Sequence, residues 1–390
     1  MENFTYAIST RSYFGRGQIG NLGKNIIKYS KKVLLVYGGG SIKQNGIYDA
    51  VRGELSAHGI DCVEMGGVEP NAKLDKVKQG VCLGRKEGVD GVLAVGGGST
   101  LDCAKVIAGC IPYDGDPWDL ISMKVKYKKV LPIFTVLTLS AAGSEMDALA
   151  VITDLERREK LITGSPMMLP KASICDPSYT FTVPKYHTAA GCSDIFSHLL
   201  EPYFCMDMSA QVTDGIAESL MRTVLHYAPV AMEQPENYEA RANLMWASSL
   251  AVNTLTAKGK KIGWSVHEIE HTVSAYYDHL THGVGLAILT PVWMDYVLSD
   301  KTAPRFAVYG RNVFGIGSDV PDSDAAKMAI AKTREFFASL GLPSKLSEVG
   351  IKDNSHFDDM AVKAFGPDGR DDSFIPLSVA DVRNILENAL

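Results

Sequence analysis

The sequence predicts an α/β half followed by an all-helical half, and three observations support this division. In the first half, short apolar runs alternate with stretches that carry the 3.6-residue periodicity of amphipathic helices. Most of these runs end in glycine-rich or hydroxyl-rich turns, as strands do where a crossover helix begins. After Pro184 the helical periodicity continues without a convincing strand run. We therefore expect an N-terminal parallel-sheet domain at 1–185 and a C-terminal helical domain at 186–390.

The strands of the first half are predicted from its short apolar runs. They are expected at 33–37, 62–65, 92–95, 131–136, 148–153 and 172–175. Helical patterns at 47–58 and 74–87 lie between them. Because parallel strands need a crossover connection, this alternation predicts a parallel sheet that is covered by helices on both faces.

The second half is predicted from its helical periodicity alone. This periodicity runs through 186–229, 238–255, 325–340 and 379–390. Glycines fall mostly between these segments, where they end helices rather than interrupt them. The second half is therefore expected to be all-α.

The composition indicates a globular protein without a nucleic-acid or membrane partner. Of its 390 residues, 46% are hydrophobic and 22% are charged, and the formal net charge is −6. A negative balance disfavours nucleic acid and anionic membrane surfaces. No apolar run reaches the roughly 18 residues that span a bilayer, and the first residues lack a secretory signal pattern. Seven scattered cysteines without a CxxC pair argue against disulfides and thiolate zinc, so we expect a cytoplasmic protein.

A triple-glycine turn lies between a predicted strand and the helix that begins at Thr100. Glycines let backbone N–H groups approach a phosphate closely, and the N-terminus of the following helix favours an anion. A tight turn with a polar cap explains this turn equally well when it is considered alone. The candidate nucleotide-binding residues here are Gly96, Gly97, Gly98, Ser99 and Asp102.

Two more loops at predicted strand ends strengthen the nucleotide hypothesis. One is a second glycine turn, and the other is rich in hydroxyl groups that can bond to phosphate or ribose oxygens. The chain lacks both the GxGxxG fingerprint and a GK[ST] motif, so the prediction of a Rossmann-like dinucleotide domain depends on several loops together. The candidate residues are Gly38, Gly39, Gly40, Ser41, Thr138, Leu139, Ser140 and Ser144.

Carboxylate and imidazole groups in the second half have the spacing of metal ligands. Asp194 and His198 lie four residues apart in a helical context, as do His267 and His271, so each pair shares one helix face. His282 follows shortly after the second pair. Each pair alone is ordinarily a surface or capping pair. Together they indicate a divalent first-row metal bound by oxygen and nitrogen.

The segment HEIEH at 267–271 also matches the HExxH signature of zinc proteases, in which Glu268 would be the general base. The extended form of that signature needs a glycine and a histidine where this chain has Ser274 and Tyr277. No third ligand is evident on a following helix. A metalloprotease is therefore kept as a remote alternative.

These motifs resemble those of the iron-containing (group III) alcohol dehydrogenases, and the chain looks most like the butanol dehydrogenase branch of that family. The resemblance extends over nearly the whole chain. The matching motifs are FGRG at 14–17, GGGSTLDCAK at 96–105, TLSAAGSE at 138–145, ITDLERREK at 152–160, TAAGCSDIFSHLLE at 188–201, HEIEH at 267–271 and THGVGLAI at 281–288.

The resemblance implies roles for individual residues. His271 matches a histidine that lies near the metal and substrate without being a regular ligand. Lys160 matches a lysine near the nicotinamide. The N-terminal segment 3–17 looks like edge strands that pair across a dimer axis, so a homodimer is expected by analogy. The implied metal ligands are Asp194, His198, His267 and His282.

The sequence departs from many relatives at Gly39, where they carry an Asp that bonds the ribose and repels a 2′-phosphate. Without that acid, Ser41 or Lys43 is available to bind the phosphate. We therefore expect NADP(H) to be favoured over NAD(H). A further histidine, His279, is expected to face solvent rather than compete for the metal.

These features predict a metal-dependent oxidoreductase that transfers a hydride between NAD(P)(H) and a short-chain primary alcohol or aldehyde such as butanol or butanal. The metal, Fe²⁺ or Zn²⁺, is expected to act as a Lewis acid on the substrate oxygen. His271 is the candidate catalytic residue, because imidazole can relay a proton near neutral pH. A polyol or sugar-type dehydrogenase of the same fold is the main alternative.

Overall fold

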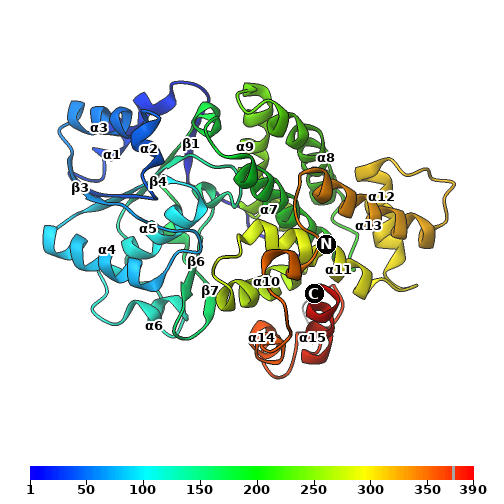
Figure 1. Cartoon of the computed structure of the whole chain (residues 1–390). Helices are drawn as coiled ribbons and strands as arrows, with labels where there is room; N and C mark the ends of the chain where they lie inside the picture. Colours follow the sequence, from blue (N-terminus) through cyan, green and yellow to red (C-terminus); the bar gives the residue numbers. More distant parts are fainter. Residues whose placement is uncertain (371–373) are drawn as a thin grey trace. The chain divides into compact units, whose positions relative to one another are not determined.

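A six-stranded parallel sheet organises the N-terminal part of the chain (Figure 1). It belongs to a computed structural model that describes residues 1–370 and 374–390. All neighbouring strands in the sheet are parallel, which confirms the predicted architecture. In spatial order the strands are β1 (Arg11–Phe14), β8 (Ala172–Cys175), β5 (Ile133–Leu137), β4 (Gly91–Gly96), β2 (Lys32–Tyr37) and β3 (Asp61–Met65).

Helices cover both faces of this sheet, as the apolar strands require. On β2, which lies between β4 and β3, Leu34 and Val36 join the core cluster on one face, and Val33 and Leu35 join the cluster on the other. All four side chains are fully buried. The first face is covered by α4 (Leu74–Glu87), α5 (Gly98–Cys110) and α6 (Pro117–Ile121), and the second by α1 (Leu22–Ile26) and α3 (Ile47–Ala57).

One predicted strand lies outside the parallel sheet. β6 (Leu149–Asp154) pairs with β7 (Glu159–Gly164) as a separate antiparallel hairpin. The connection at 155–158 is too short for the crossover that a parallel pair needs. Sequence reasoning missed β7, because its alternating polar residues did not read as an apolar run.

The structure divides into two compact units. The α/β unit comprises Ala7–Val183 and Pro235–Ser249, and the helical unit comprises Met1–Tyr6, Pro184–Gln234 and Leu250–Leu390. The chain thus leaves the α/β unit near the predicted boundary, but most of α9 (Tyr238–Val252) returns to it. On α9, Ser248 donates a hydrogen bond to the main-chain oxygen of Ala141 and Ser249 donates one to Glu145. These bonds explain why a later helix belongs to the first unit.

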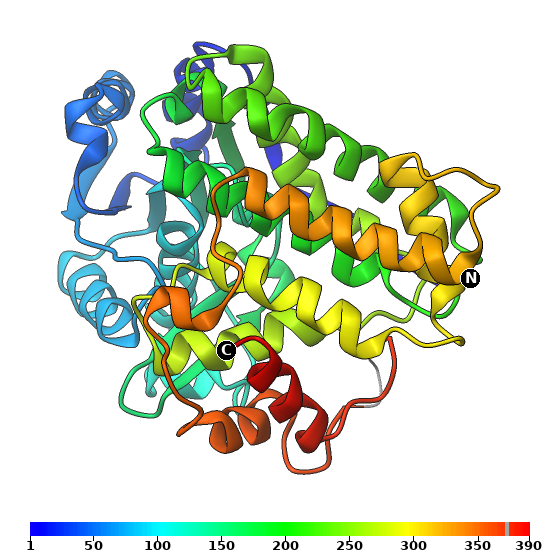
Figure 2. The same cartoon turned by 45° about the vertical axis from the view of Figure 1, so that its right-hand side comes forward.

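The helical unit contains no β-strand among its described residues, as predicted. No helix in the described part of the chain is both long and apolar enough to span a bilayer. The last two helices, orange-red and red in Figure 2, pack against each other. The helices are α7 (Lys185–Tyr203), α8 (Gln211–Glu233), α10 (Ser265–Tyr276), α11 (His282–Val297), α12 (Ala303–Phe314), α13 (Asp322–Ser339), α14 (Phe357–Phe365) and α15 (Val379–Asn388).

Close packing of α11 on α7 depends on a glycine. A Cβ atom at Gly283 would lie 2.0 Å from the main-chain oxygen of Ala190 on α7. No side chain fits in that space, so only glycine lets the two helices approach this closely. The contact brings the first residue of α11, His282, toward the polar face of α7.

Candidate metal centre and nucleotide loops

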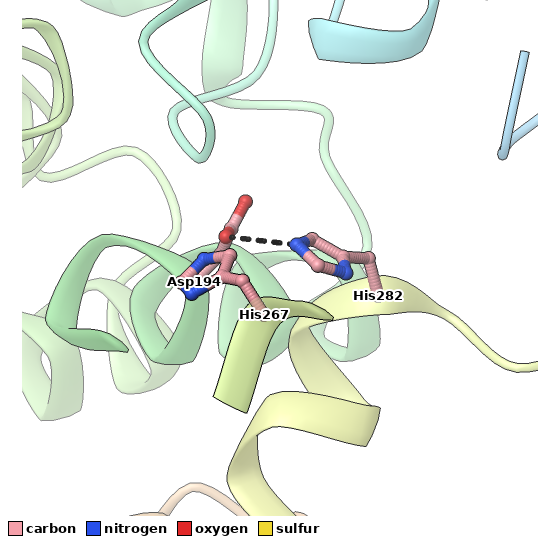
Figure 3. Close-up of side chains that lie close together, drawn as sticks. All are labelled: Asp194, His267 and His282. Carbon is pink, nitrogen blue, oxygen red and sulfur yellow. Dashed lines mark ion pairs between the residues drawn. The ribbon is translucent and has the colours of Figure 1, made fainter. Parts of the chain in front are cut away.

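Three helices of the helical unit bring three of the predicted metal-binding side chains, Asp194, His267 and His282, together (Figure 3). α7 supplies Asp194 and His198, α10 supplies His267 and His271, and α11 begins at His282. The i,i+4 spacing places each pair on one face of its helix. Asp194 and His267, 73 positions apart in the sequence, therefore meet at one place because α11 packs against both α7 and α10.

Asp194, His267 and His282 form a group that one metal ion can reach. Each offers a ligand atom, and these atoms lie within 4.8 Å of one another. Asp194 and His267 are 5% and 3% exposed. The buried Oδ1 of Asp194 accepts no well-aligned hydrogen bond from the described residues, although Nδ1 of His198 lies 3.0 Å away and Nε2 of His282 lies 3.7 Å away. A buried carboxylate oxygen whose neighbours are imidazole nitrogens fits a divalent first-row cation.

His198, the fourth predicted ligand, lies beside this group. Its Nδ1 is 2.9 Å from the main-chain oxygen of Asp194 and 3.0 Å from that residue's Oδ1. Its ring centroid is 4.4 Å from that of His267. The role of His198 as a ligand stays a prediction.

His271 is buried near the group, with its ring centroid 5.3 Å from that of His282 and 6.5 Å from that of His267. It also forms a second set of possible ligands with Glu270 and His282. This position suits a group that acts close to the metal. His279, by contrast, is exposed and contacts the main-chain oxygen of Val349 through Nε2 at 3.0 Å.

Two buried carboxylates beside the histidines were not identified from the sequence. Glu201 lies 3.0 Å from Nδ1 of His267, and Glu270 contacts Nδ1 of His282. A signal was present: Glu201 follows Asp194 by seven residues and Glu270 follows His267 by three, so both lie on the faces that carry the metal-binding side chains. The HExxH pattern favours Glu268, the residue next to the first histidine, over Glu270.

The surroundings of the histidines favour the charged form of Asp194 and disfavour the charged form of Glu201. Burial by itself raises the pKa of Asp194, but the adjacent imidazoles of His198 and His282 outweigh burial and hold the pKa below the usual aspartate range. Burial raises the pKa of Glu201 to about 8. The cluster therefore contains an ionised aspartate that can neutralise part of a divalent charge.

The predicted nucleotide loops gather at one edge of the parallel sheet in the α/β unit. The turn at 38–41 follows β2, the turn at 96–99 joins β4 to α5, and the loop at 138–145 follows β5. β2, β4 and β5 are adjacent, so their carboxyl ends share one edge. Ligands of open parallel sheets bind at this edge.

Two of these loops also touch each other. A Cβ at Gly97 would lie 3.1 Å from the side chain of Leu139, and one at Gly98 would lie 3.2 Å from that of Ala142. The hydroxyl oxygen of Ser140 is buried and has no hydrogen-bond partner among the described residues. Small residues and an unused hydroxyl at a strand-end edge fit a phosphate-bearing ligand.

Three other candidates make contacts inside the α/β unit. Ser144 donates a hydrogen bond of 2.6 Å to Asp102, which also accepts one of 3.0 Å from the main chain of Val151. Burial raises the pKa of Asp102 to about 6. Lys160 donates a hydrogen bond of 3.2 Å to Asn71. Asp102 and Ser144 thus hold α5 to the following loop and β6, and their contact with a nucleotide stays a prediction.

Two family models match this chain, one in its N-terminal part and one in its C-terminal part. A family model described as iron-containing alcohol dehydrogenase matches residues 9–177, and one described as Fe-containing alcohol dehydrogenase family, C-terminal, matches residues 188–390. Both describe alcohol dehydrogenases, so the protease alternative is not supported.

Individual proteins that are similar to this chain are also alcohol dehydrogenases or aldehyde reductases. The chain is 52% identical to NADH-dependent butanol dehydrogenase A of Clostridium acetobutylicum over 391 residues, which cover 100% of both chains. It is 38% identical to the NADPH-dependent aldehyde reductase YqhD of Escherichia coli, with 91% of each covered. The crystal structure of NADH-dependent butanol dehydrogenase A from Thermotoga maritima matches with a TM-score of 0.93 and 41% identity, covering 100% of this chain and 99% of that one. The chain therefore belongs to the iron-containing alcohol dehydrogenase family and is an NAD(P)-dependent alcohol dehydrogenase.

Proposed function

We propose that this enzyme interconverts a short-chain primary alcohol and its aldehyde, with butanol and butanal as the best substrates, at one divalent metal held by Asp194, His198, His267 and His282. The observation that carries the proposal is the buried Oδ1 of Asp194, which accepts no well-aligned hydrogen bond from the described residues and faces the imidazole nitrogens of His198 and His282. Relatives with 52% and 50% identity are named butanol dehydrogenases, which supports the substrate. The description of the family supports Fe²⁺.

The chemistry that the metal and the nicotinamide supply when bound is polarisation of the substrate oxygen and exchange of a hydride with the substrate carbon. The chain's own residues orient these groups and handle the proton. Asp194 contributes one negative charge, so a divalent site with neutral imidazoles keeps a net positive charge that favours an alkoxide oxygen. Buried His271 is the group we propose to pass the alcohol proton toward solvent, and to return it during aldehyde reduction.

The turn at 38–41 is where we propose that the enzyme distinguishes NADP(H) from NAD(H). Lys43, in the short helix α2 (Ser41–Gln44), is half-exposed and lies 3.5 Å from Glu64 and over the rings of Tyr37 and Tyr48. Its charge favours a 2′-phosphate, and Glu64 offsets part of that charge. Relatives named NADH-dependent and NADPH-dependent both occur, so the expected preference for NADP(H) stays a prediction.

Gly39→Asp is expected to lower the ratio of kcat/KM with NADPH to kcat/KM with NADH by about tenfold or more, because an added carboxylate repels the 2′-phosphate. Space is not limiting, since a Cβ at Gly39 meets no atom within 4 Å. Gly39→Asn has the same shape without the charge and serves as the control. Equal ratios in the Asp and Asn variants would show that this turn does not contact the 2′-phosphate.

The proposed reaction is tested by reduction of butanal and oxidation of butanol with each nucleotide. Removal of the metal with a chelator is expected to abolish activity, and Fe²⁺ is expected to restore it. The panel includes glycerol and 1,3-propanediol, because a 1,3-propanediol dehydrogenase from Citrobacter freundii is 32% identical to this chain. Full activity after metal removal would refute the metal mechanism, and faster turnover of a polyol would favour the alternative substrate class.

We also propose that the enzyme is a cytoplasmic homodimer. β1 is an edge strand of the sheet, and no strand of the described residues pairs with its outer edge, so this edge is available for another chain. Cys103, Cys110 and Cys175 are buried as thiols, as a reducing compartment favours.

A further inference from the structure

Glu201 and Glu270 each contact an imidazole of the proposed metal site. Each contact is made to Nδ1 of the ring, not to Nε2. Oε1 of Glu201 lies 3.0 Å from Nδ1 of His267 and accepts a 2.7 Å hydrogen bond from the main-chain N–H of the same residue. Oε2 of Glu270 contacts Nδ1 of His282, whose Nε2 faces Asp194. Both glutamates are buried. The two histidines therefore have the same arrangement, with a carboxylate at Nδ1.

A carboxylate at Nδ1 determines the chemistry of the other ring nitrogen. Nδ1 donates its proton to the carboxylate, so the neutral ring keeps its lone pair on Nε2. We propose that Glu201 and Glu270 are positioning residues, which hold His267 and His282 with the Nε2 lone pair directed at the cation site. This inference rests on the proposed metal site and adds two residues to it that do not bind the metal.

The surroundings of Glu270 are shaped around its carboxylate. Its other oxygen, Oε1, accepts a hydrogen bond from the hydroxyl of Ser274, one turn further along α10. A Cβ at Gly285 on α11 would lie 2.7 Å from Cγ and 2.8 Å from Oε1 of Glu270. Glycine at this position therefore leaves the space that the carboxylate fills. The carboxylate is held on both oxygens, which fixes the plane of the His282 ring.

The expected effect is on metal affinity, because loss of such outer partners typically weakens metal binding or activity by about 10- to 100-fold. Glu270→Met replaces the hydrogen-bond acceptor with an apolar side chain of similar volume. We expect Zn²⁺ affinity to fall by about 100-fold. Glu270→Gln and Glu201→Gln keep an oxygen atom that can accept a hydrogen bond but replace the carboxyl group with an amide, and we expect Zn²⁺ affinity to fall about tenfold. Glu268→Gln is the matched control, since Glu268 lies on the same helix and pairs with Arg370 at 3.6 Å.

The experiment titrates the metal-free full-length protein with Zn²⁺ against a chromophoric chelator and records the visible spectrum of the Co²⁺-loaded form. Weakened Zn²⁺ binding with a shifted Co²⁺ spectrum in the Glu270 and Glu201 variants, and neither change in Glu268→Gln, is the expected result. Unchanged affinity and spectrum, or equal losses in Glu268→Gln, would overturn the inference. If Glu270→Met does not fold, the two Gln variants test the inference by the same two measurements, Zn²⁺ affinity and the Co²⁺ spectrum. Failure of the unsubstituted protein to bind Zn²⁺ would overturn the proposed function itself, and this inference with it.

Discussion

His267→Ala is expected to abolish binding of the divalent metal and to lower kcat/KM for butanal by about 1,000-fold or more. Its imidazole offers one of three ligand atoms that lie within 4.8 Å of one another, so its loss leaves an incomplete site. Loss of the Lewis acid raises the free energy of the transition state by several kcal/mol. Each 1.36 kcal/mol lowers the rate about tenfold. The measurement is metal content per chain, together with steady-state kinetics.

His279→Ala is the matched control for that experiment. His279 is exposed and its Nε2 contacts the main chain at Val349. This variant is expected to keep both metal and activity. Retention of a full equivalent of metal by His267→Ala would remove His267 from the ligand set. Loss of metal in His279→Ala would show that the site extends further than the structure indicates.

His271→Ala is expected to keep the metal and to lose about 10²- to 10⁴-fold in kcat, the range for removal of a general acid–base group. His271 is buried near His282 but lies outside the group that includes Asp194. The distinguishing readout is the pH profile of kcat, which should lose the ionisation assigned to an imidazole. Metal content is measured in parallel on the same preparation.

The opposite result for His271 has a specific structural meaning. Glu270, His271 and His282 form a second set of ligand atoms within 4.8 Å of one another. If His271→Ala empties the site, the metal is bound by that set, and His271 is a ligand rather than a proton carrier. Simple addition of imidazole to the His271→Ala enzyme separates the two roles further, because a free base can restore proton transfer without restoring a lost metal.

Much of the fold was predictable because strands and helices have different periodicities. The apolar run at 33–37 can be buried on both faces only inside a parallel sheet, and the structure buries alternate side chains of β2 in two separate clusters. The hairpin of β6 and β7 was not predictable in the same way. β7 carries polar residues, and its pairing with β6 is set by a short turn rather than by an apolar pattern.

The candidate site was predictable where its residues lie on one helix. Spacing by four residues identified Asp194 with His198, and His267 with His271, because such residues share a helix face. Glu201 and Glu270 were missed, since a buried glutamate on a helix looks in the sequence like an ordinary surface residue. Asp102 and Ser144 were predicted to contact a nucleotide; the structure shows that they bond to each other, and their contact with a nucleotide stays a prediction.

The sequence by itself determined the order of the α/β and helical parts, the strand-end glycine turns and the helix faces that carry carboxylate and imidazole groups. All of these follow from local periodicity and spacing. Only the tertiary structure decided which of these faces meet, that α9 returns to the α/β unit, and that Glu201 and Glu270 contact the metal-site histidines. The physical reason is that these contacts depend on close helix packing, such as that allowed by Gly283 and Gly285, between residues far apart in the chain.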